Sequence, residues 1–258
     1  MRRRTINLCL VAAVVGGDAA FPSAQHGRTQ HEPHPAGDPA HQAAAPQHGE
    51  PQMRHRGPAD HSFADAEAWA ERFEGPDRDQ WQMPERVVEA LALEPGMTVA
   101  DIGSGTGYFA RSFAAAVGTT GTVFATDVEP SMAEYVRKRA DEDGQANLIP
   151  VLASYDDPRL PDRSVDLAFI CNTWHHIHDR VDYARRLAGD LRPGGRIAIV
   201  DFLPGELPVG PGPEHKLSAG EVTAELEAAG YRLAASPEFL PYQYLLVFER
   251  SSSGSDSP

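Results

Sequence analysis

Short apolar runs alternate with amphipathic segments over residues 98–202, and this alternation constrains the fold more than any other feature of the chain. Strands that alternate with helices, and are apolar along their length, form a mostly parallel sheet that is covered on both faces. The sequence therefore predicts a doubly wound α/β domain. Five apolar runs have the length of buried strands: residues 98–102, 122–126, 148–152, 165–171 and 196–202.

Helices are predicted before, between and after these runs. Ser131 and Ser218 each stand three residues before a glutamate, which is the spacing of a helix capping box. Two final apolar runs, residues 231–235 and 242–248, have the length of a closing hairpin. The predicted helices are residues 66–73, a helix opened by Pro84, and residues 108–117, 131–141, 179–191 and 218–229.

Charge and cysteine content exclude several classes of protein. Lysine and arginine number 23 and acidic residues 37, giving a formal net charge of −14. A nucleic-acid partner is disfavoured because such binding depends on basic residues that displace counterions. The two cysteines, Cys9 and Cys171, are too few for a disulfide scaffold or a cysteine-based zinc cluster. No apolar run reaches the roughly 18–20 residues that span a bilayer.

The first 24 residues have the pattern of a secretory signal. Three arginines follow Met1, residues 6–15 are mostly apolar, and small residues come next. The arginines also weakly suggest a twin-arginine signal. We therefore expect residues 1–24 to direct export to the periplasm or the medium. The alternatives are a disordered leader of a cytoplasmic protein, or translation from Met53.

Residues 25–62 are rich in histidine, proline, glycine and alanine, and we expect them to be disordered, as is the tail at 251–258. Neutral imidazoles can bind zinc, copper or nickel, but the irregular spacing favours a polar linker, with weak metal binding as the alternative. The globular domain is then residues 63–250. Seven of the eleven histidines lie in the linker: His26, His31, His34, His41, His48, His55 and His61.

A glycine-rich loop follows the first strand of the predicted sheet, where Asp101 begins the pattern D-x-G-x-G-x-G. Glycines let a ligand approach the backbone closely, and a loop that ends at a helix N-terminus suits a nucleotide-type ligand. Dinucleotide enzymes have G-x-G-x-x-G, whose third glycine is replaced here by Tyr108. Asp127 ends the next strand, where a carboxylate can accept hydrogen bonds from both ribose hydroxyls.

Residues 85–205 resemble class I S-adenosylmethionine-dependent methyltransferases, of the small-molecule branch that includes quinone C-methyltransferases. Four motifs carry the resemblance over about half of the chain: residues 99–107, 123–127, 160–166 and 191–196, the last being Leu-x-Pro-Gly-Gly before the fifth strand. The resemblance implies a Rossmann-like, three-layer α/β/α fold with a seven-stranded sheet whose last strand is antiparallel. It also implies S-adenosylmethionine as cofactor.

The resemblance further implies a set of cofactor-binding residues. The glycines of the loop would line the methionine and ribose of the cofactor, Asp101 would orient the loop or meet the amino group, and Asp127 would hold the ribose. Many relatives have Asp or Asn where Ser154 stands, so Asp156 is the alternative contact for adenine. The full set is Asp101, Gly103, Gly105, Gly107, Asp127, Ser154, Asp156 and Asn172, with Tyr155 and Thr173 beside them.

Methyl transfer is an in-line displacement that mainly requires alignment, and a general base is needed only if the acceptor must lose a proton. His175 and His176 follow the fourth strand and are candidate bases, with packing and a structural hydrogen bond as the alternative roles. His215 is a second candidate on the substrate side. Trp81, with Gln82, is a candidate cap over the pocket or a core residue.

Some acceptors are disfavoured. An amino-methylating nucleic-acid enzyme would be expected to carry Asn/Asp-Pro-Pro-Tyr where this chain has residues 172–175, and arsenite methyltransferases use several cysteines. A small organic acceptor remains, methylated at oxygen or carbon. One alternative is an exported metal-binding protein with an inactive methyltransferase-like fold, since S-adenosylmethionine is made in the cytoplasm. A second alternative, an NAD-dependent oxidoreductase, is disfavoured by Tyr108.

Overall fold

The computed structural model describes residues 65–251. The predicted signal at residues 1–24, the predicted histidine-rich linker at 25–62 and nearly all of the predicted tail at 251–258 lie outside the described residues, so these interpretations remain predictions. Within the described range, no helix is both long and apolar enough to cross a membrane.

Seven strands form one sheet in the order β3-β2-β1-β4-β5-β7-β6. Strands β1 to β5 run parallel, whereas β7 is antiparallel to both β5 and β6. This confirms the predicted α/β class, the seven strands and the antiparallel last strand. The strands are β1 Thr98–Ile102, β2 Thr122–Asp127, β3 Leu148–Leu152, β4 Val165–Cys171, β5 Leu191–Phe202, β6 Tyr231–Ala235 and β7 Gln243–Arg250.

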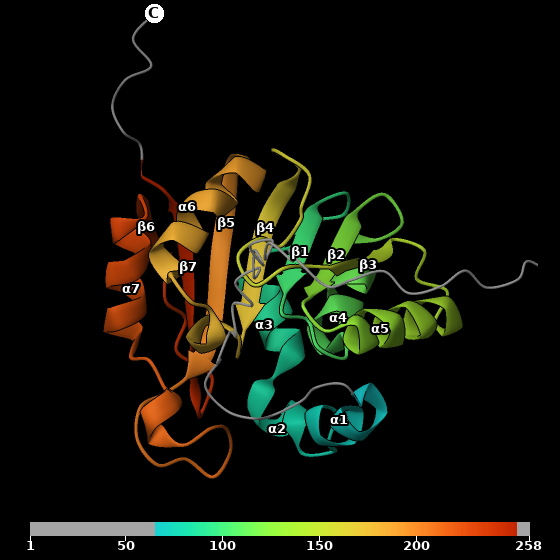
Figure 1. The fold of residues 1–258 in the computed structure, drawn as a ribbon, viewed down its shortest axis with the longest axis horizontal. Helices are drawn as coiled ribbons and strands as arrows, with labels where there is room; N and C mark the ends of the chain where they lie inside the picture. The colour runs from blue at the N-terminus through green and yellow to red at the C-terminus, as the bar shows by residue number, and fades with distance from the viewer. Residues whose placement is uncertain (1–64, 252–258) are drawn as a thin grey trace, which may run out of the picture. The chain divides into compact units, whose positions relative to one another are not determined.

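Helices cover both faces of the sheet, which gives three layers (Figure 1). Because neighbouring residues of a strand point to opposite faces, Ala100 packs in the apolar cluster beneath α6 and α7, and Val99 in the cluster beneath α3, α4 and α5. The helices are α1 Ala66–Phe73, α2 Arg78–Gln82, α3 Pro84–Ala90, α4 Tyr108–Val117, α5 Pro130–Glu142, α6 Arg180–Asp190 and α7 Ala219–Ala228; two 3₁₀ turns are η1 Trp174–His176 and η2 Pro213–His215.

Most predicted elements agree with the structure to within a few residues, and the differences have local causes. The capping box at Ser218 is present, with its hydroxyl accepting from the Glu221 amide. The one predicted at Ser131 is wrong: α5 begins one residue earlier, at Pro130, after an N-cap at Glu129. Strand β5 begins at Leu191 rather than residue 196, because its first residues pair with β4 across an irregular register.

Helices α1 and α2 lie beyond the end of the sheet at which β5 leads into the loop carrying η2 (Figure 1). The α2 helix was not predicted, since its five residues show no apolar periodicity. In a doubly wound sheet, ligands bind beyond the carboxyl ends of the parallel strands. The fold thus brings α1, α2, the glycine loop and the histidines after β4 toward one edge.

Candidate functional site

The glycine loop turns sharply between β1 and α4. Gly103, Gly105 and Gly107 have φ values of 69°, 53° and 79°, in the left-handed region that favours glycine. A Cβ added to Gly103 would lie 2.4 Å from the side chain of Thr173. The amides of Gly103 and Ser104 both donate to the carbonyl of Thr126, at 2.8 and 3.0 Å. Glycine at position 103 is therefore required both by backbone conformation and by space.

Asp127 connects this loop to the end of β2. Its Oδ2 accepts from the Gly105 amide at 2.8 Å, and its Oδ1 accepts from the Glu129 amide at 2.9 Å. Burial raises the pKa of the carboxyl, while these backbone hydrogen bonds act in the opposite direction. An ionised carboxylate has about four acceptor positions, and the amides of Gly105, Glu129 and Val128 use three of them, so one remains for a ligand. The predicted ribose contact has this capacity.

Asp101 lies at the end of β1, with an exposed fraction of 3%. Burial raises the pKa of its carboxyl to about 7, opposed by the amide of Ala110 and by the charge of Arg78. The amide of Ala110 belongs to the first turn of α4, so Asp101 holds the glycine loop between β1 and that helix. This position fits the predicted role of orienting the loop.

Arg78 is a cationic residue of this site that sequence reasoning missed. Its guanidinium lies 3.8 Å from the ring centroid of Tyr108, and its charge acts on both Asp101 and Cys171. Nη1 donates to the carbonyl of Phe73, and Nη2 donates to Gln82 at 3.3 Å. Its Nε is buried without a partner. Arg78 thus contributes a positive charge and an unused donor close to the glycine loop.

A row of buried amides attaches α2 to the sheet. Gln82 donates to Gln243 of β7, and Gln243 donates to Asn172 just after β4. Asn172 has a φ of 54°, a left-handed conformation that asparagine tolerates better than most residues. Gln243 carries no motif in the sequence, and only the topology that brings β7 beside β5 reveals it. The predicted residue Asn172 is therefore held from α2 through β7.

Ser154 and Asp156 occupy the loop after β3, where the adenine contact was predicted. The Ser154 hydroxyl donates to Asp156 at 3.0 Å, which lowers the pKa of that carboxyl. Asp156 also forms an ion pair with Arg186 of α6, at 3.6 Å, and the neighbouring Tyr155 is 67% exposed. These residues lie together, but the ion pair of Asp156 leads toward α6 rather than the glycine loop, and the adenine role remains a prediction.

His175 and His176 form part of η1, and the structure separates their environments. The Nδ1 atom of His175 lies 2.8 and 3.0 Å from the two carboxylate oxygens of Asp201, near the end of β5. The ring of His176 stacks at 4.1 Å from that of His175. Partial burial and the charge of His175 lower the pKa of His176 to about 4, although part of this residue is open to solvent. Asp201 was not predicted.

Of the two predicted substrate residues, Trp81 contacts Phe202, which follows Asp201. The ring of Trp81 lies 5.9 Å from that of Phe202, and Lys216 Nζ lies 6.0 Å from the same ring. His215 is exposed and lies 3.3 Å from Glu214, yet its charge reaches His176. Trp81 is half-buried rather than a core residue. The structure therefore gathers an aromatic pair and several titratable groups at this end of β5.

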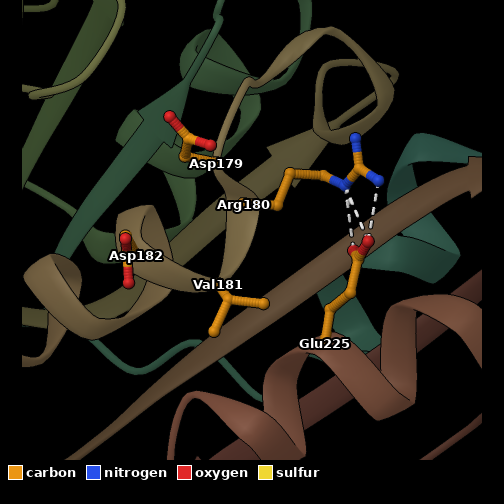
Figure 2. Close-up of a pocket in the computed structure, with 5 residues that line it drawn as sticks. All are labelled: Asp179, Arg180, Val181, Asp182 and Glu225. Carbon is orange, nitrogen blue, oxygen red and sulfur yellow. Dashed lines mark hydrogen bonds and ion pairs between the residues drawn. The ribbon is translucent and has the colours of Figure 1, made fainter.

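A surface hollow lies between the start of α6 and α7, lined by Asp179, Arg180, Val181, Asp182 and Glu225 (Figure 2). Arg180 and Glu225 point toward each other across it and pair at 2.7 Å, whereas the carboxylates of Asp179 and Asp182 point away from this pair. Glu225 also accepts from the indole of Trp174 at 2.9 Å. Glu225, which lines the hollow, therefore binds residues on both sides of His175: Trp174 before it and Arg180 after it.

Two hydroxyls of the glycine loop are left without protein partners. Ser104 Oγ and Thr106 Oγ1 are buried and make no hydrogen bond. A buried polar group without a partner costs free energy, so such groups indicate a bound ligand or water. No group of three or more metal-ligating side chains is found among residues 65–251. The loop therefore offers hydroxyl and amide groups, rather than metal ligands, to a bound molecule.

Comparison with known proteins agrees with this geometry. A family described as "Methyltransferase domain" matches residues 99–195, from β1 to the start of β5. The matched range contains the glycine loop, Asp127, Ser154, Asp156 and both histidines of η1.

Two curated relatives are named ubiquinone/menaquinone biosynthesis C-methyltransferase. The protein from Ectopseudomonas mendocina is 34% identical over 116 residues, covering 45% of each chain. The protein from Bordetella avium is 37% identical over 116 residues, covering 43% of each. The chain spans less than half the length of either relative.

A solved structure covers more of the fold. A SAM-dependent methyltransferase from Aquifex aeolicus superposes with a TM-score of 0.67 and 29% identity, over 70% of this chain and 96% of its own. The sheet and helices described above thus correspond to nearly the whole of that protein.

Proposed function

Because residues 99–195 form a methyltransferase domain of the class I S-adenosylmethionine-dependent family, we propose that this protein transfers a methyl group from S-adenosylmethionine to oxygen or carbon of a small organic acceptor. The observation that carries the proposal is the arrangement of Asp127, whose two oxygens are fixed by the amides of Gly105 and Glu129. The carboxylate keeps an acceptor position for a ribose hydroxyl, because the amides of Gly105, Glu129 and Val128 use three of about four.

The residues present fit the cofactor. Ser104 and Thr106 offer buried hydroxyls without protein partners, and the glycines leave room for a ligand against the backbone. Arg78 would attract the carboxylate at the methionine end, because its Nε is unpaired and its charge reaches Asp101 and Cys171. Asp101 would remain a support of the loop through the Ala110 amide.

The cofactor, when bound, supplies an electrophilic methyl group on a sulfonium. The protein's contribution to such a displacement is to align the acceptor and exclude water. Phe73 of α1 lies 3.7 Å from where a Cβ of Gly105 would be, and Tyr108 donates to Asp79 of α2. Helices α1 and α2 therefore cover the glycine loop and would limit access of water to it.

A small acceptor fits the composition and the site. The net charge of −14 opposes binding to a phosphate backbone. Trp81 and Phe202 offer aromatic surface close to the histidines after β4. The curated relatives are named as C-methyltransferases of ubiquinone and menaquinone biosynthesis. These observations favour an organic acceptor with a flat, apolar part.

Calorimetric titration of the full chain with S-adenosylmethionine, S-adenosylhomocysteine and NAD tests the proposal. We expect micromolar binding of the two sulfur compounds and no binding of NAD. Asp127→Ala should weaken binding by about 1–3 kcal/mol, the cost of a lost buried hydrogen-bond partner. Binding of NAD alone, or of none of the three, would contradict the proposal.

A further inference from the structure

The buried pair of His175 and Asp201 has the geometry of an oriented base. The two side chains are 5% and 1% exposed, and both carboxylate oxygens lie within 3.0 Å of Nδ1. Asp201 Oδ1 also accepts from the Phe202 amide at 2.9 Å, which fixes the carboxylate. A carboxylate at Nδ1 keeps the ring proton there, so the lone pair is on Nε2.

Nε2 of His175 is available for a further partner. Within the described part of the chain, this nitrogen makes no hydrogen bond. The segment that carries the ring is held from behind, because Glu225 binds both the Trp174 indole and the Arg180 guanidinium. Nε2 of His175 is not among the buried side-chain atoms that lack a partner, so this nitrogen is reachable from solvent and therefore by an acceptor.

His176 is less suited to act as the base. Its pKa is lowered to about 4, mainly by burial and then by the charge of His175, with the Asp201 charge acting in the opposite direction, and within residues 65–251 its ring forms no ion pair with a carboxylate. A weakly basic imidazole takes up a proton poorly near neutral pH. The structure thus distinguishes two adjacent histidines that the sequence left equivalent.

The pair lies between the glycine loop and the aromatic contact. Thr173, two residues before His175, donates to the Gly103 carbonyl at 3.4 Å. Phe202, directly after Asp201, contacts Trp81 of α2. Cys171 is influenced by the charges of both Asp101 and Asp201. An acceptor lying on the Phe202 and Trp81 rings would therefore have its reacting group close to both His175 and the glycine loop.

We propose that His175 is the catalytic base of this site and Asp201 its positioning residue, and that the acceptor carries an aromatic or enolic hydroxyl. This inference rests on the proposed function. The acceptor O–H bond breaks and its proton goes to Nε2. The resulting electron pair forms the new bond to the methyl carbon, at oxygen or at the conjugated carbon. The carbon–sulfur bond breaks with its electrons on sulfur, giving S-adenosylhomocysteine, and the imidazolium later releases its proton to water.

Other titratable groups face this pair and must be separated from it in any pH study. Cys171 of β4 and Tyr244 of β7 have their pKa values raised by burial, so both stay neutral near pH 7. His176 adjoins His175 on its own segment, and His215 of η2 acts on His176. Lys216 lies over the Phe202 ring. A His215→Gln variant measures any contribution of His215, in the η2 loop, to the pH profile.

The first test is methyl transfer by the full chain from methyl-labelled S-adenosylmethionine to catechol, 1,4-naphthohydroquinone and aniline, at pH 5.5 to 9. We expect transfer to a hydroxyl compound. His175→Gln should lower kcat at least 100-fold, within the range for loss of a general base, and abolish the acid limb of the pH profile. Asp201→Asn should lower kcat about 10-fold or more, with partial rescue by Asp201→Glu. S-adenosylhomocysteine affinity should stay within twofold in all three.

The second test needs no acceptor. Diethylpyrocarbonate acylates neutral imidazole, and peptide mass spectrometry locates the product. We expect His175 to react at pH 7 and Asp201→Asn to react at least fivefold more slowly. His178→Gln, three residues away at an exposed position, is the matched control and should behave as wild type in both tests.

The outcomes separate this inference from the proposed function. Absence of S-adenosylhomocysteine binding by the wild-type chain contradicts the proposed function itself. Cofactor binding with transfer to aniline alone overturns the acceptor class. Wild-type kcat in His175→Gln overturns the role of the base. If none of the three acceptors is methylated, the acylation result decides, and an unreactive His175 overturns the inference.

Discussion

The two sides of this site are built in different ways. On the glycine-loop side, backbone groups hold the key carboxylates: Asp127 accepts from the amides of Gly105 and Glu129, and Asp101 from that of Ala110. On the histidine side, one side chain binds another: Asp201 of β5 binds His175 of η1, which follows β4. Under the proposed function, the first side would bind the cofactor and the second would receive the acceptor. The first side therefore depends on local chain geometry, whereas the second depends on the topology of the sheet.

The largest expected effect is on the glycine-loop side. Gly103→Ala places a Cβ 2.4 Å from Thr173 at a φ of 69°. Overlap and left-handed strain together should lower the free energy of unfolding by about 3–5 kcal/mol in urea denaturation. Gly105→Ala is the matched control, because its Cβ would meet only Phe73 at 3.7 Å. It should cost about 1–2 kcal/mol, from backbone strain alone. Equal costs would show that Thr173 moves away freely.

The next largest effect is expected in the row of buried amides formed by Gln82, Gln243 and Asn172. Gln243→Leu leaves the donor of Gln82 and the acceptor of Asn172 without partners. We expect a loss of about 2–3 kcal/mol in urea denaturation, because unpaired buried polar groups are expensive. Gln80→Leu, at an exposed position of α2, the helix that carries Gln82, should change the free energy of unfolding by less than about 0.5 kcal/mol. Equal stability of the two variants would contradict a structural link through Gln243.

On the glycine-loop side, we expect the titration of Asp101 to make the free energy of unfolding fall as pH rises. Its pKa is raised from 3.8 to about 7, so between these values the native state holds a proton that the unfolded state has lost. The free energy of unfolding therefore falls as pH rises through this window, by roughly 2 kcal/mol between pH 5 and 7. Asp101→Asn should remove this fall in urea titrations at several pH values. An unchanged slope would contradict the assignment.

On the histidine side, we expect the titration of His176 to make the free energy of unfolding rise with pH, by less than the fall caused by Asp101. Its pKa is lowered from 6.5 to about 4, so between these values the unfolded state binds a proton that the native state does not. Stability from this group rises with pH across the window and is lost on acidification. Since the residue is partly exposed, we expect only a few tenths of a kcal/mol. His176→Gln should reduce the rise of the free energy of unfolding with pH, measured by urea denaturation, whereas His178→Gln should leave it unchanged. An unchanged slope of that free energy against pH in His176→Gln would contradict the assignment.

The same contrast explains what the sequence could and could not predict. The sheet, most helices, the glycine loop and Asp127 depend on local patterns, and the predicted seven strands with an antiparallel last strand are confirmed. Asp201 and Gln243 could not be found from local patterns, because neither has a motif and each meets its partner only through strand order. Arg78 was missed because α2 is too short to show periodicity.

One calorimetric series can measure the contributions of both sides to cofactor binding. The full chain, Asp127→Ala and Asp201→Asn are titrated with S-adenosylhomocysteine in a calorimeter. We predict micromolar binding to the wild-type chain, binding about 5- to 150-fold weaker in Asp127→Ala, and binding within twofold of wild type in Asp201→Asn. Loss of affinity in Asp201→Asn, or full affinity in Asp127→Ala, would contradict the division of the site into a side that holds the cofactor and a side that handles the acceptor.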